Sequence, residues 1–458
     1  MNSLPALPLA KRATREGSIL IVVLWVVFGL VGLTLYFAHS MTMELRASDN
    51  RVAGIEAEQA IEGARRYFTC VLSNVNVAGT VPDGQTYLHE AASVGNAKFW
   101  LIGRGNPEDS PTMAHFGLID EASKVNLNTA SSNLLINLPR MTPELVANIL
   151  AWRSTNTTSM AGGAESDTYM SSPTPYICKN APFESVDELR LIYNMDMQTL
   201  YGEDANLNGI LDPNENDGDA LPPSDDLNGR LDAGLLEYVT VYSREPSTYT
   251  NLDSSGAITN IARVNVTTLA GNTTPLRSVM VTNGIASDRA DQIIARIAGQ
   301  TLTSPLQLYI VGGMSATEIA QIETCVRGSN VVGLINVNTA ATNVLMGIPG
   351  LDSGQAAQLV AYREANTNAL NGSIGWVTQV LNQTSATQAG PYLTVKGYQF
   401  TADIAALGHN GRGYRRTRFV FDTRSGAPVI LHRQDLSHLG WALGKDIRDK
   451  YLLAKNTP

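Results

Sequence analysis

The sequence predicts an α+β protein, in which a long N-terminal helix, first transmembrane and then amphipathic, precedes a small antiparallel sheet with a large inserted helical domain. Three observations predict this fold class. An uncharged apolar run stands near the N-terminus. A 30-residue segment recurs 210 positions later in the chain. Short strand-like segments with alternating apolar residues lie on both sides of the helical block.

The apolar run extends from Ser18 to Ala38 without a charged residue. Roughly 20 such residues can cross the hydrocarbon of a bilayer as a helix, whereas the apolar region of a secretory signal runs about 7–15 residues. Lys11, Arg12 and Arg15 precede the run, so this end should stay in the cytoplasm and the rest of the chain should lie outside. We therefore predict a transmembrane helix over residues 18–38.

Residues 39–75 are predicted to continue this helix in amphipathic form. Apolar residues recur at spacings of three, four or seven, and charged residues fill the other faces. No proline interrupts the chain between Leu9 and Val81. The predicted apolar stripe, which should face a folded domain, consists of Met41, Leu45, Val52, Ile55, Ile61, Phe68 and Leu72.

A basic leader, a glycine, an apolar helix and an amphipathic continuation form a layout that resembles the type IV pilins and pseudopilins. In that family a prepilin peptidase cuts after the glycine and methylates the new N-terminus. The resemblance thus implies a leader over residues 1–17 and processing between Gly17 and Ser18. Most members have Glu five residues after the cut, where this chain has Val22. The segment Ile21–Trp25 instead resembles the minor pseudopilin K of type II secretion systems (the general secretion pathway protein K family), which lacks that Glu.

Composition limits the classes of function. The net charge of −9 argues against a surface that binds duplex DNA, because such binding depends on Lys and Arg that neutralise phosphates. The three cysteines, Cys70, Cys178 and Cys325, fit no metal motif. One disulfide could form in an oxidising compartment, and the sequence leaves both the pair and the alternative of buried thiols open.

The internal repeat consists of residues 124–153 and 334–363. The two copies align without a gap and are identical at ten positions, namely Asn126, Asn128, Thr129, Ala130, Asn133, Leu135, Pro139, Ala147, Ala151, Arg153 and their counterparts. Residues 121–200 and 236–390 are therefore predicted as two helical repeat regions. A third, degenerate copy begins near Val264 and includes residues 304–308.

Each copy is predicted to fold as a helix-hairpin-helix unit. In the first copy, Asn128 or Thr129 should accept hydrogen bonds from the first turn of a short helix that runs to Leu138. Pro139 should end that helix, and a second helix should run from about Pro143 to Trp152. Each copy is followed by a further short helical segment, over residues 183–189 and 375–381.

Helix-hairpin-helix units often bind DNA through a Gly-x-Gly turn whose backbone approaches a phosphate. The turn of the first copy contains no glycine, and Asp352 in the second would repel a phosphate. Because basic clusters are also missing around these turns, we expect packing and protein contacts, and no nucleic acid as a partner.

Residues 201–235 are predicted to form an acidic calcium-binding linker. The segment 204–215 fits the twelve-residue calcium loop, with Gly209 at the sharp turn and Leu211 anchoring the loop in the core. Oxygen ligands are the preferred donors for calcium. The predicted ligands are Asp204, Asn206, Asn208, the carbonyl of Ile210, Asp212 and Glu215.

A second, less regular loop follows, with Asp226, Asn228 and Asp232 as predicted calcium ligands. Its twelfth position is Leu235, so the closing Glu is missing. The sequence leaves Glu237, Asp225, or the pair Asp217 and Asp219 as substitutes. The resemblance to pseudopilin K, a calcium-binding family, also implies calcium here, in a structural role.

The remaining segments are predicted to form a pilin-like body. Residues 76–120 should supply its first part, with strands over 98–102 and 115–120. Residues 391–458 should supply the C-terminal strands, over 398–404, 416–421 and 428–433. Strands on both sides of a helical block imply an inserted domain, and this antiparallel meander should cover the apolar stripe of the N-terminal helix.

No catalytic constellation occurs in the sequence, so we do not expect an enzyme. The resemblance implies a minor pseudopilin of a type II protein secretion system, at the tip of the periplasmic pseudopilus, with a structural role in protein export. The expected location is the inner membrane, crossed once, with the C-terminal bulk in the periplasm. Expected partners are the other minor pseudopilins, the pseudopilus, the prepilin peptidase and the membrane, with secreted proteins as further candidates. Alternatives are a minor type IV pilin and a membrane-anchored helix-hairpin-helix DNA receptor.

Overall fold

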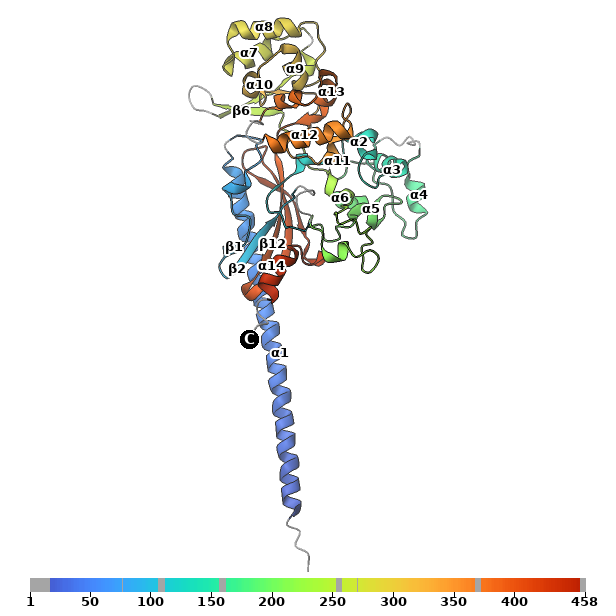
Figure 1. Ribbon diagram of the computed structural model, residues 1–458, viewed down its shortest axis with the longest axis vertical. Helices are drawn as coiled ribbons and strands as arrows, with labels where there is room; N and C mark the ends of the chain where they lie inside the picture. Colours follow the sequence, from blue (N-terminus) through green and yellow to red (C-terminus); the bar gives the residue numbers. More distant parts are fainter. Residues whose placement is uncertain are drawn as a thin grey trace, which may run out of the picture.

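The computed structural model of the chain describes residues 17–75, 77–105, 112–155, 162–252, 258–269, 271–366 and 372–453. A long helix forms a rod that carries a head of strands and short helices (Figure 1). Of the predicted leader, only Gly17 lies within the described residues. The head contains a six-stranded sheet and a larger helical part, so the α+β class is confirmed.

The rod is helix α1, Gly17–Ser73, a single helix of 57 residues. It is long and apolar enough to cross a membrane, and none of the residues in its apolar window is buried by the rest of the chain. The prediction of one helix that continues from the apolar run into the head is therefore confirmed. At 1.5 Å per residue such a helix is ~85 Å long, which explains the elongated shape in Figure 1.

The face of α1 that packs on the sheet differs from the predicted stripe. Ile61, Phe68 and Leu72 are buried as predicted, whereas Met41, Leu45, Val52 and Ile55 are exposed. Alanines supply most of the buried face, at Ala53, Ala57, Ala60 and Ala64. Alanine is too small to stand out in an apolar pattern, but it lets a helix lie close against a neighbouring backbone.

Two glycines in the sheet show how close this approach is. A Cβ atom at Gly408 would lie 2.1 Å from the carbonyl oxygen of Ala53, and one at Gly413 would lie 2.3 Å from its carbonyl carbon. Gly413 also has a positive φ of 69°, which L side chains rarely adopt. The hairpin between β12 (Gln399–Leu407) and β13 (Arg415–Asp422) can therefore touch the backbone of α1 only with glycine at both positions.

The sheet is antiparallel in the order β1-β2-β12-β13-β14, with β3 paired beside β12. Strands from before and after the helical block thus share one sheet, as predicted. The strand expected over 115–120 is reduced to β3 and one isolated bridge between Phe116 and Ile102. The bounds are β1 Ala92–Val94, β2 Ala97–Ile102, β3 Ile119–Asp120, β12 Gln399–Leu407, β13 Arg415–Asp422 and β14 Val429–Asp435.

The helical part lies between β3 and β12 in sequence. Its α-helices are α2 Ser132–Ile136, α3 Pro143–Arg153, α4 Ser166–Met170, α5 Met197–Tyr201, α6 Leu235–Tyr238, α7 Thr274–Thr282, α8 Ser287–Ile297, α9 Pro305–Gly312, α10 Ala316–Ile322, α11 Thr342–Leu345, α12 Ser353–Ala365 and α13 Gln383–Ala389. Short 3-10 turns include η3 Val186–Leu191 and η7 Ile374–Gln379. After β14 come η10 Ser437–Leu439, α14 Gly444–Arg448 and the π-turn η11 Asp449–Leu453.

Three short parallel strand pairs recur in this part. They are β4 Val125–Asn126 with β5 Val239–Thr240, β8 Val264–Asn265 with β9 Val326–Arg327, and β10 Ile335–Asn336 with β11 Leu393–Thr394. Each first strand begins one of the three sequence copies. A separate antiparallel hairpin joins β6 Thr248–Leu252 to β7 Ile258–Ala262. A short parallel strand pair thus stands at the start of all three copies, including the third, degenerate copy.

Identical residues of the repeat make equivalent hydrogen bonds. Arg153 donates to the carbonyls of Leu127 and Ala130, and Arg363 donates to those of Val337 and Ala340. These carbonyls are related by the repeat offset. A side chain that ties the end of one helix to the start of its unit explains why both copies contain this arginine.

The predicted helix starts need one correction. Ser131, rather than Asn128 or Thr129, caps α2, and its hydroxyl accepts from the backbone N–H of Leu134 at 3.3 Å. The Asn128 side chain instead bonds both backbone groups of Phe183. Asn128 therefore fastens the following segment to the unit, which a capping rule does not anticipate.

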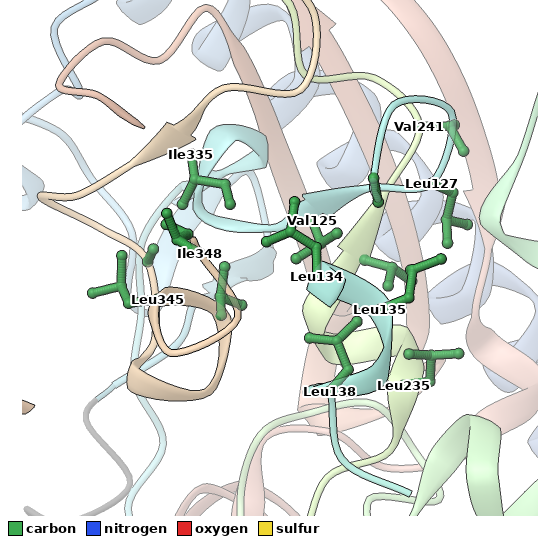
Figure 2. Packing of buried hydrophobic residues seen from close by; sticks show 14 of the residues in the cluster. Val125, Leu127, Leu134, Leu135, Leu138, Leu235, Val241, Ile335, Leu345 and Ile348 are labelled. Carbon is green, nitrogen blue, oxygen red and sulfur yellow. The ribbon is translucent and has the colours of Figure 1, made fainter. Parts of the chain in front are cut away.

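The largest core joins both repeat copies. In Figure 2, Leu135 and Leu138 from the first copy and Leu345 and Ile348 from the second belong to one cluster of buried residues. A separate cluster fills the unit formed by α7–α10, and another lies between α1 and the sheet. The two sequence-related copies are thus stabilised as one packed body.

A charged cluster fixes the lower end of the sheet to α1. The ring of His409 contacts Asp49 through Nε2 at 2.8 Å and Glu56 through Nδ1 at 2.6 Å. Arg412 adds an ion pair with Asp49. Hydrogen bonds from the two carboxylates raise the pKa of His409, and the histidine lowers the pKa values of both carboxylates.

This cluster predicts a pH-dependent stability. Because the pKa of folded His409 is raised, its contribution is complete below about 6.5, the ordinary value for histidine, and is lost as the pH rises through the raised value. We expect the thermal unfolding midpoint of the full-length protein in detergent micelles to decrease as the pH is raised from about 6 to about 9. His409→Gln should remove this part of the pH dependence, as measured by circular dichroism.

His438→Gln is the matched control, because His438 is exposed and lies outside the cluster. It should keep the wild-type pH dependence. Equal slopes of midpoint against pH in wild type and His409→Gln would contradict the assignment.

Candidate metal centre

The segment predicted as the first calcium loop folds into a compact turn. The Asp204 carboxylate accepts hydrogen bonds from the backbone N–H groups of Asn208 and Gly209, each at 2.9 Å. Gly209 has a φ of 72°, so glycine fits the sharp turn expected at this position. The side chains of Asp204, Asn206 and Asn208 thus lie on one short turn.

The remaining predicted ligands close the same loop. Both amide groups of Asn206 and Asn208 donate to one oxygen of Asp212, at 2.8 and 3.0 Å. The two oxygens of Glu215 accept from the N–H groups of Ala205 and Asp212. Ile210 and the predicted anchor Leu211 are buried.

Buried acid groups make this loop a suitable place for a cation. Asp204 and Glu215 are each only 1% exposed. Burial raises the pKa of Glu215 to about 8, with the nearby charges of Asp204 and Asp212 acting in the same direction. Carboxylates buried so close together repel each other, and a hard cation with oxygen ligands would relieve that repulsion. Carboxylate, amide and carbonyl oxygens, which this loop contains, are the donor types that calcium prefers.

Two arginines attach the backbone of this loop to the sheet. Arg416 on β13 donates to the carbonyls of Asn206 and Leu207, at 2.5 and 2.7 Å. Arg104, just after β2, donates to the carbonyls of Leu207 and Asn208, at 3.2 and 3.4 Å. Sequence analysis did not identify these contacts, because Arg104 and Arg416 lie more than 100 positions from the residues that they contact.

Arg416 is itself held by a buried ion pair. Its guanidinium donates twice to Asp403 on β12, at 2.8 and 2.7 Å, and both side chains are 0% exposed. Although burial raises the pKa of Asp403, Arg416 and the neighbouring Arg418 hold it well below its usual range. The charge of Asp403 on the central strand therefore positions Arg416, which in turn binds the backbone of the first loop.

The second predicted loop gathers its ligands around a residue that the sequence did not suggest. Carboxylate oxygens of Glu203, Asp226 and Asp232 lie within 4.8 Å of one another. Asn228 donates to Asp232 at 3.3 Å, so all three predicted ligands lie at this place. Burial, followed by the charges of Asp232 and Asp226, raises the pKa of Glu203. Three acidic oxygens at this spacing can hold a divalent cation.

Glu203 thus lies where the second loop lacks its closing Glu, a position for which the sequence suggested other acids. Glu237 forms an ion pair with Arg104 at 2.8 Å, and Asp225 accepts from the N–H groups of Asp217 and Gly218. Glu203 reaches the second loop because an antiparallel bridge joins Gly202 to Ala233. The only local signal was its position beside Asp204, at the start of the first loop.

The two loops are therefore neighbours in the chain and in space. Glu203, which lies beside Asp226 and Asp232 of the second loop, immediately precedes Asp204, the first predicted ligand of the first loop. The backbone N–H of Glu203 donates to the carbonyl of Asp232 at 3.0 Å. The predicted processing residues Gly17 and Ser18 lie at the opposite end of the molecule, where α1 begins.

An apolar N-terminal helix that packs on an antiparallel sheet is the layout that the sequence resemblance to pilins and pseudopilins predicts. Residues 119–201 match the family model described as type II secretion system (T2SS), protein K. The chain therefore carries a domain of the type II secretion protein K family, and the resemblance to minor pseudopilin K is confirmed. The matched residues include β4, α2 and α3.

Among solved structures, the chain is similar to one in the crystal structure of the GspK-GspI-GspJ complex from the enterotoxigenic Escherichia coli type 2 secretion system. The identity is 10%, the TM-score is 0.39, and the alignment covers 86% of this chain and 98% of that chain. No curated protein matches the sequence. The resemblance to protein K thus rests on the matched domain, residues 119–201.

The contact between Arg416 and Asp403 predicts a large loss of stability on substitution. Arg416→Gln leaves Asp403 buried with a reduced counter-charge and removes one donor from each of the carbonyls of Asn206 and Leu207, of which only Leu207 keeps a bond from Arg104. Removing one partner of a buried pair costs about 3–5 kcal/mol. Urea denaturation of the full-length protein in detergent micelles should show a loss of this size.

Arg424→Gln is the control, because Arg424 pairs with Asp422 on the same sheet but is 31% exposed. Asp422 is buried but keeps its bond from Gln399, and the Arg424 side chain stays in contact with water, so we expect a clearly smaller loss than for Arg416→Gln. Similar losses for the two variants would contradict the role given to Arg416.

Proposed function

We propose that the protein is a minor pseudopilin of a type II secretion system and acts as a structural subunit at the tip of the periplasmic pseudopilus. The observation that carries this proposal is the match of residues 119–201 to protein K of that system, on a head borne by a 57-residue helix. The same match favours the secretion system over the type IV pilus, which the sequence alone left open.

The exposed apolar part of α1 is the feature that joins this subunit to its partners. Its apolar side chains from Ile19 to Phe37 are each about half exposed or more. In the inner membrane this surface meets lipid, with the head in the periplasm, and in the pseudopilus it packs against the helices of other minor pseudopilins. The prepilin peptidase would act on the chain at Gly17 and Ser18. Secreted proteins are a further candidate class of partner.

The shape of the head supports a place at the end of the filament. The helical part extends beyond the sheet on the side away from the apolar end of α1 (Figure 1). A subunit of this width would prevent another from stacking above it. Val22 fits the same position. A subunit at the tip has no subunit ahead of it, so it needs no carboxylate at residue 22 to pair with the N-terminal amine of such a neighbour.

The tip assignment predicts both a mature N-terminus and a position. In pseudopili isolated from cells, mass spectrometry should find this chain beginning at N-methylated Ser18. Gold-labelled antibody against the head should bind one end of each filament. Gly17→Leu should block processing and remove the label from the filaments, because the peptidase cuts after a glycine in this family.

Gly29→Ala is the control, since a Cβ atom at Gly29 meets nothing within 4 Å. It should be processed and incorporated normally. A native chain that still begins at Met1, or that is released after cleavage near Ser40, would contradict the class, and label along the filament sides would contradict the tip position.

We also propose that the two acidic loops bind calcium in a structural role. The first would use Asp204, Asn206, Asn208, the Ile210 carbonyl, Asp212 and Glu215, and the second would use Asp226, Asn228 and Asp232 with Glu203. The burial of Asp204 and Glu215 supports this, as does the clustering of Glu203 with Asp226 and Asp232. Calcium would neutralise the acids and hold residues 201–235 against the sheet.

Calcium should stabilise the folded protein measurably. Extracellular calcium modules commonly bind with a Kd of about 10⁻⁴–10⁻³ M, and a ligand at 100 times its Kd adds about 2.7 kcal/mol to the free energy of unfolding. Glu215→Gln should weaken the first site and Glu203→Gln the second, each by roughly tenfold or more. Isothermal titration calorimetry on the full-length protein would separate the two sites.

Glu184→Gln is the control, because the side chain of Glu184 is 87% exposed and lies away from both loops. It should bind calcium as wild type does. An unfolding midpoint that does not change when chelator replaces calcium would refute the structural role.

A further inference from the structure

The lower end of the head carries a basic surface next to the membrane-spanning part of α1. Two segments form it, residues 409–415 and residues 441–451, which we call the foot of the head. Figure 1 places α14, within the second segment, where α1 leaves the head. The first segment contacts α1 directly through His409 and Asp49. The foot is therefore the part of the head closest to the bilayer when α1 spans it.

The charge of the foot is opposite to that of the chain. Its two segments contain five arginines and lysines and two aspartates, whereas the whole chain has a net charge of −9. All five cationic side chains belong to exposed residues, namely Arg412, Arg415, Lys445, Arg448 and Lys450. Protonated His409 adds to the same sign, since its pKa is raised.

Nearby carboxylates neutralise only part of this charge. Asp49 and Glu56 on α1 point at His409 and Arg412. Burial raises the pKa of Asp212, and the charge of Arg448 offsets part of that rise, so Arg448 lies near the first acidic loop. Within the part of the chain that the structure describes, no ion pair involves Lys445 or Lys450, although Lys450 lies 5.5 Å from the ring centre of Tyr451. These two lysines are thus available to an outside anion.

Distances along α1 bring the foot within reach of lipid headgroups. Ser18 to Met43 contains no Asp, Glu, Lys or Arg, and these 26 residues would extend ~39 Å. The hydrocarbon is about 30 Å thick, and the bilayer with headgroups is about 40–45 Å. Asp49, which contacts the foot, is six residues beyond Met43, or ~9 Å. That gap is close to the Debye length of about 8 Å at physiological salt, and lysine side chains shorten it further.

We infer that the foot of the head binds an anionic lipid surface while the protein is anchored in the membrane by α1. Aromatic residues support such a contact, because Trp441 and Tyr451 lie half-buried on the same segment and these side chains favour the bilayer interface. Binding at the foot would hold the head against the membrane before assembly. Extraction of the subunit into a filament would break these contacts. The inference rests on the membrane anchoring in the proposed function.

Hydrogen exchange of the full-length protein in lipid discs tests this inference. One set of discs contains phosphatidylcholine alone, and the other an equal mixture of phosphatidylcholine and phosphatidylglycerol. Backbone amides of residues 441–451 should exchange several-fold more slowly in the anionic discs at low salt, and high salt should abolish the difference. A variant is not needed for this comparison.

Lys445→Gln/Lys450→Gln should weaken the docking about 25-fold, since each cation near an anionic surface is worth about fivefold. Arg277→Gln/Arg296→Gln on α7 and α8 is the matched control, with the same change of net charge at the far end of the head (Figure 1). It should keep the protection at the foot. Exchange within β12 shows whether each variant is folded.

Equal exchange at the foot in both kinds of disc would overturn the inference and leave the proposed function intact. Protection that appears only when another pseudopilin is added would also overturn it, because the occupant would then be a protein. A chain that does not copurify with either disc would overturn the membrane anchoring and this inference together.

Discussion

The buried charge of Asp403 is the constraint on which the arrangement of the head depends. It lies in the central strand β12 and is 0% exposed, so it requires a cation. Arg416 supplies that cation and uses its remaining donors on the carbonyls of Asn206 and Leu207. Arg104 donates to the carbonyls of Leu207 and Asn208 and pairs with Glu237. One charge in the sheet thereby determines where the acidic linker lies.

The helical part uses a second kind of constraint, in which side chains bond backbone groups at equivalent places. Asn126, Asn265 and Asn336 each accept from the N–H two residues later, at 2.9–3.0 Å. Each of these asparagines lies in the first strand of a two-residue parallel pair. Arg153 and Arg363 then close the first and last units in the same way. The repeat is therefore preserved in its polar contacts as well as in several of its apolar residues.

The sequence could predict the features that depend on local spacing. The continuous helix followed from an uninterrupted apolar period, and the strands at 97–102, 399–407, 415–422 and 429–435 followed from alternation. The predicted ligands of the first loop lie on one turn because they are within twelve positions. Glu203 escaped prediction because a strand-like bridge brings it to Asp226 and Asp232 from 23 or more positions away. The alanine face of α1 escaped because close packing, and not apolar size, selects it.

The pairing of β2 with β12 has a consequence for how the chain reaches this structure. Trp100 lies opposite Ala405 in the register, so roughly 300 residues separate neighbouring positions of one sheet. Contacts so distant in sequence form slowly, because the ends of a long loop must first meet. During synthesis β2 therefore appears with an unpaired edge, and the helical units can fold before its partner strand arrives. The sheet that holds the head to α1 is the last part to be completed.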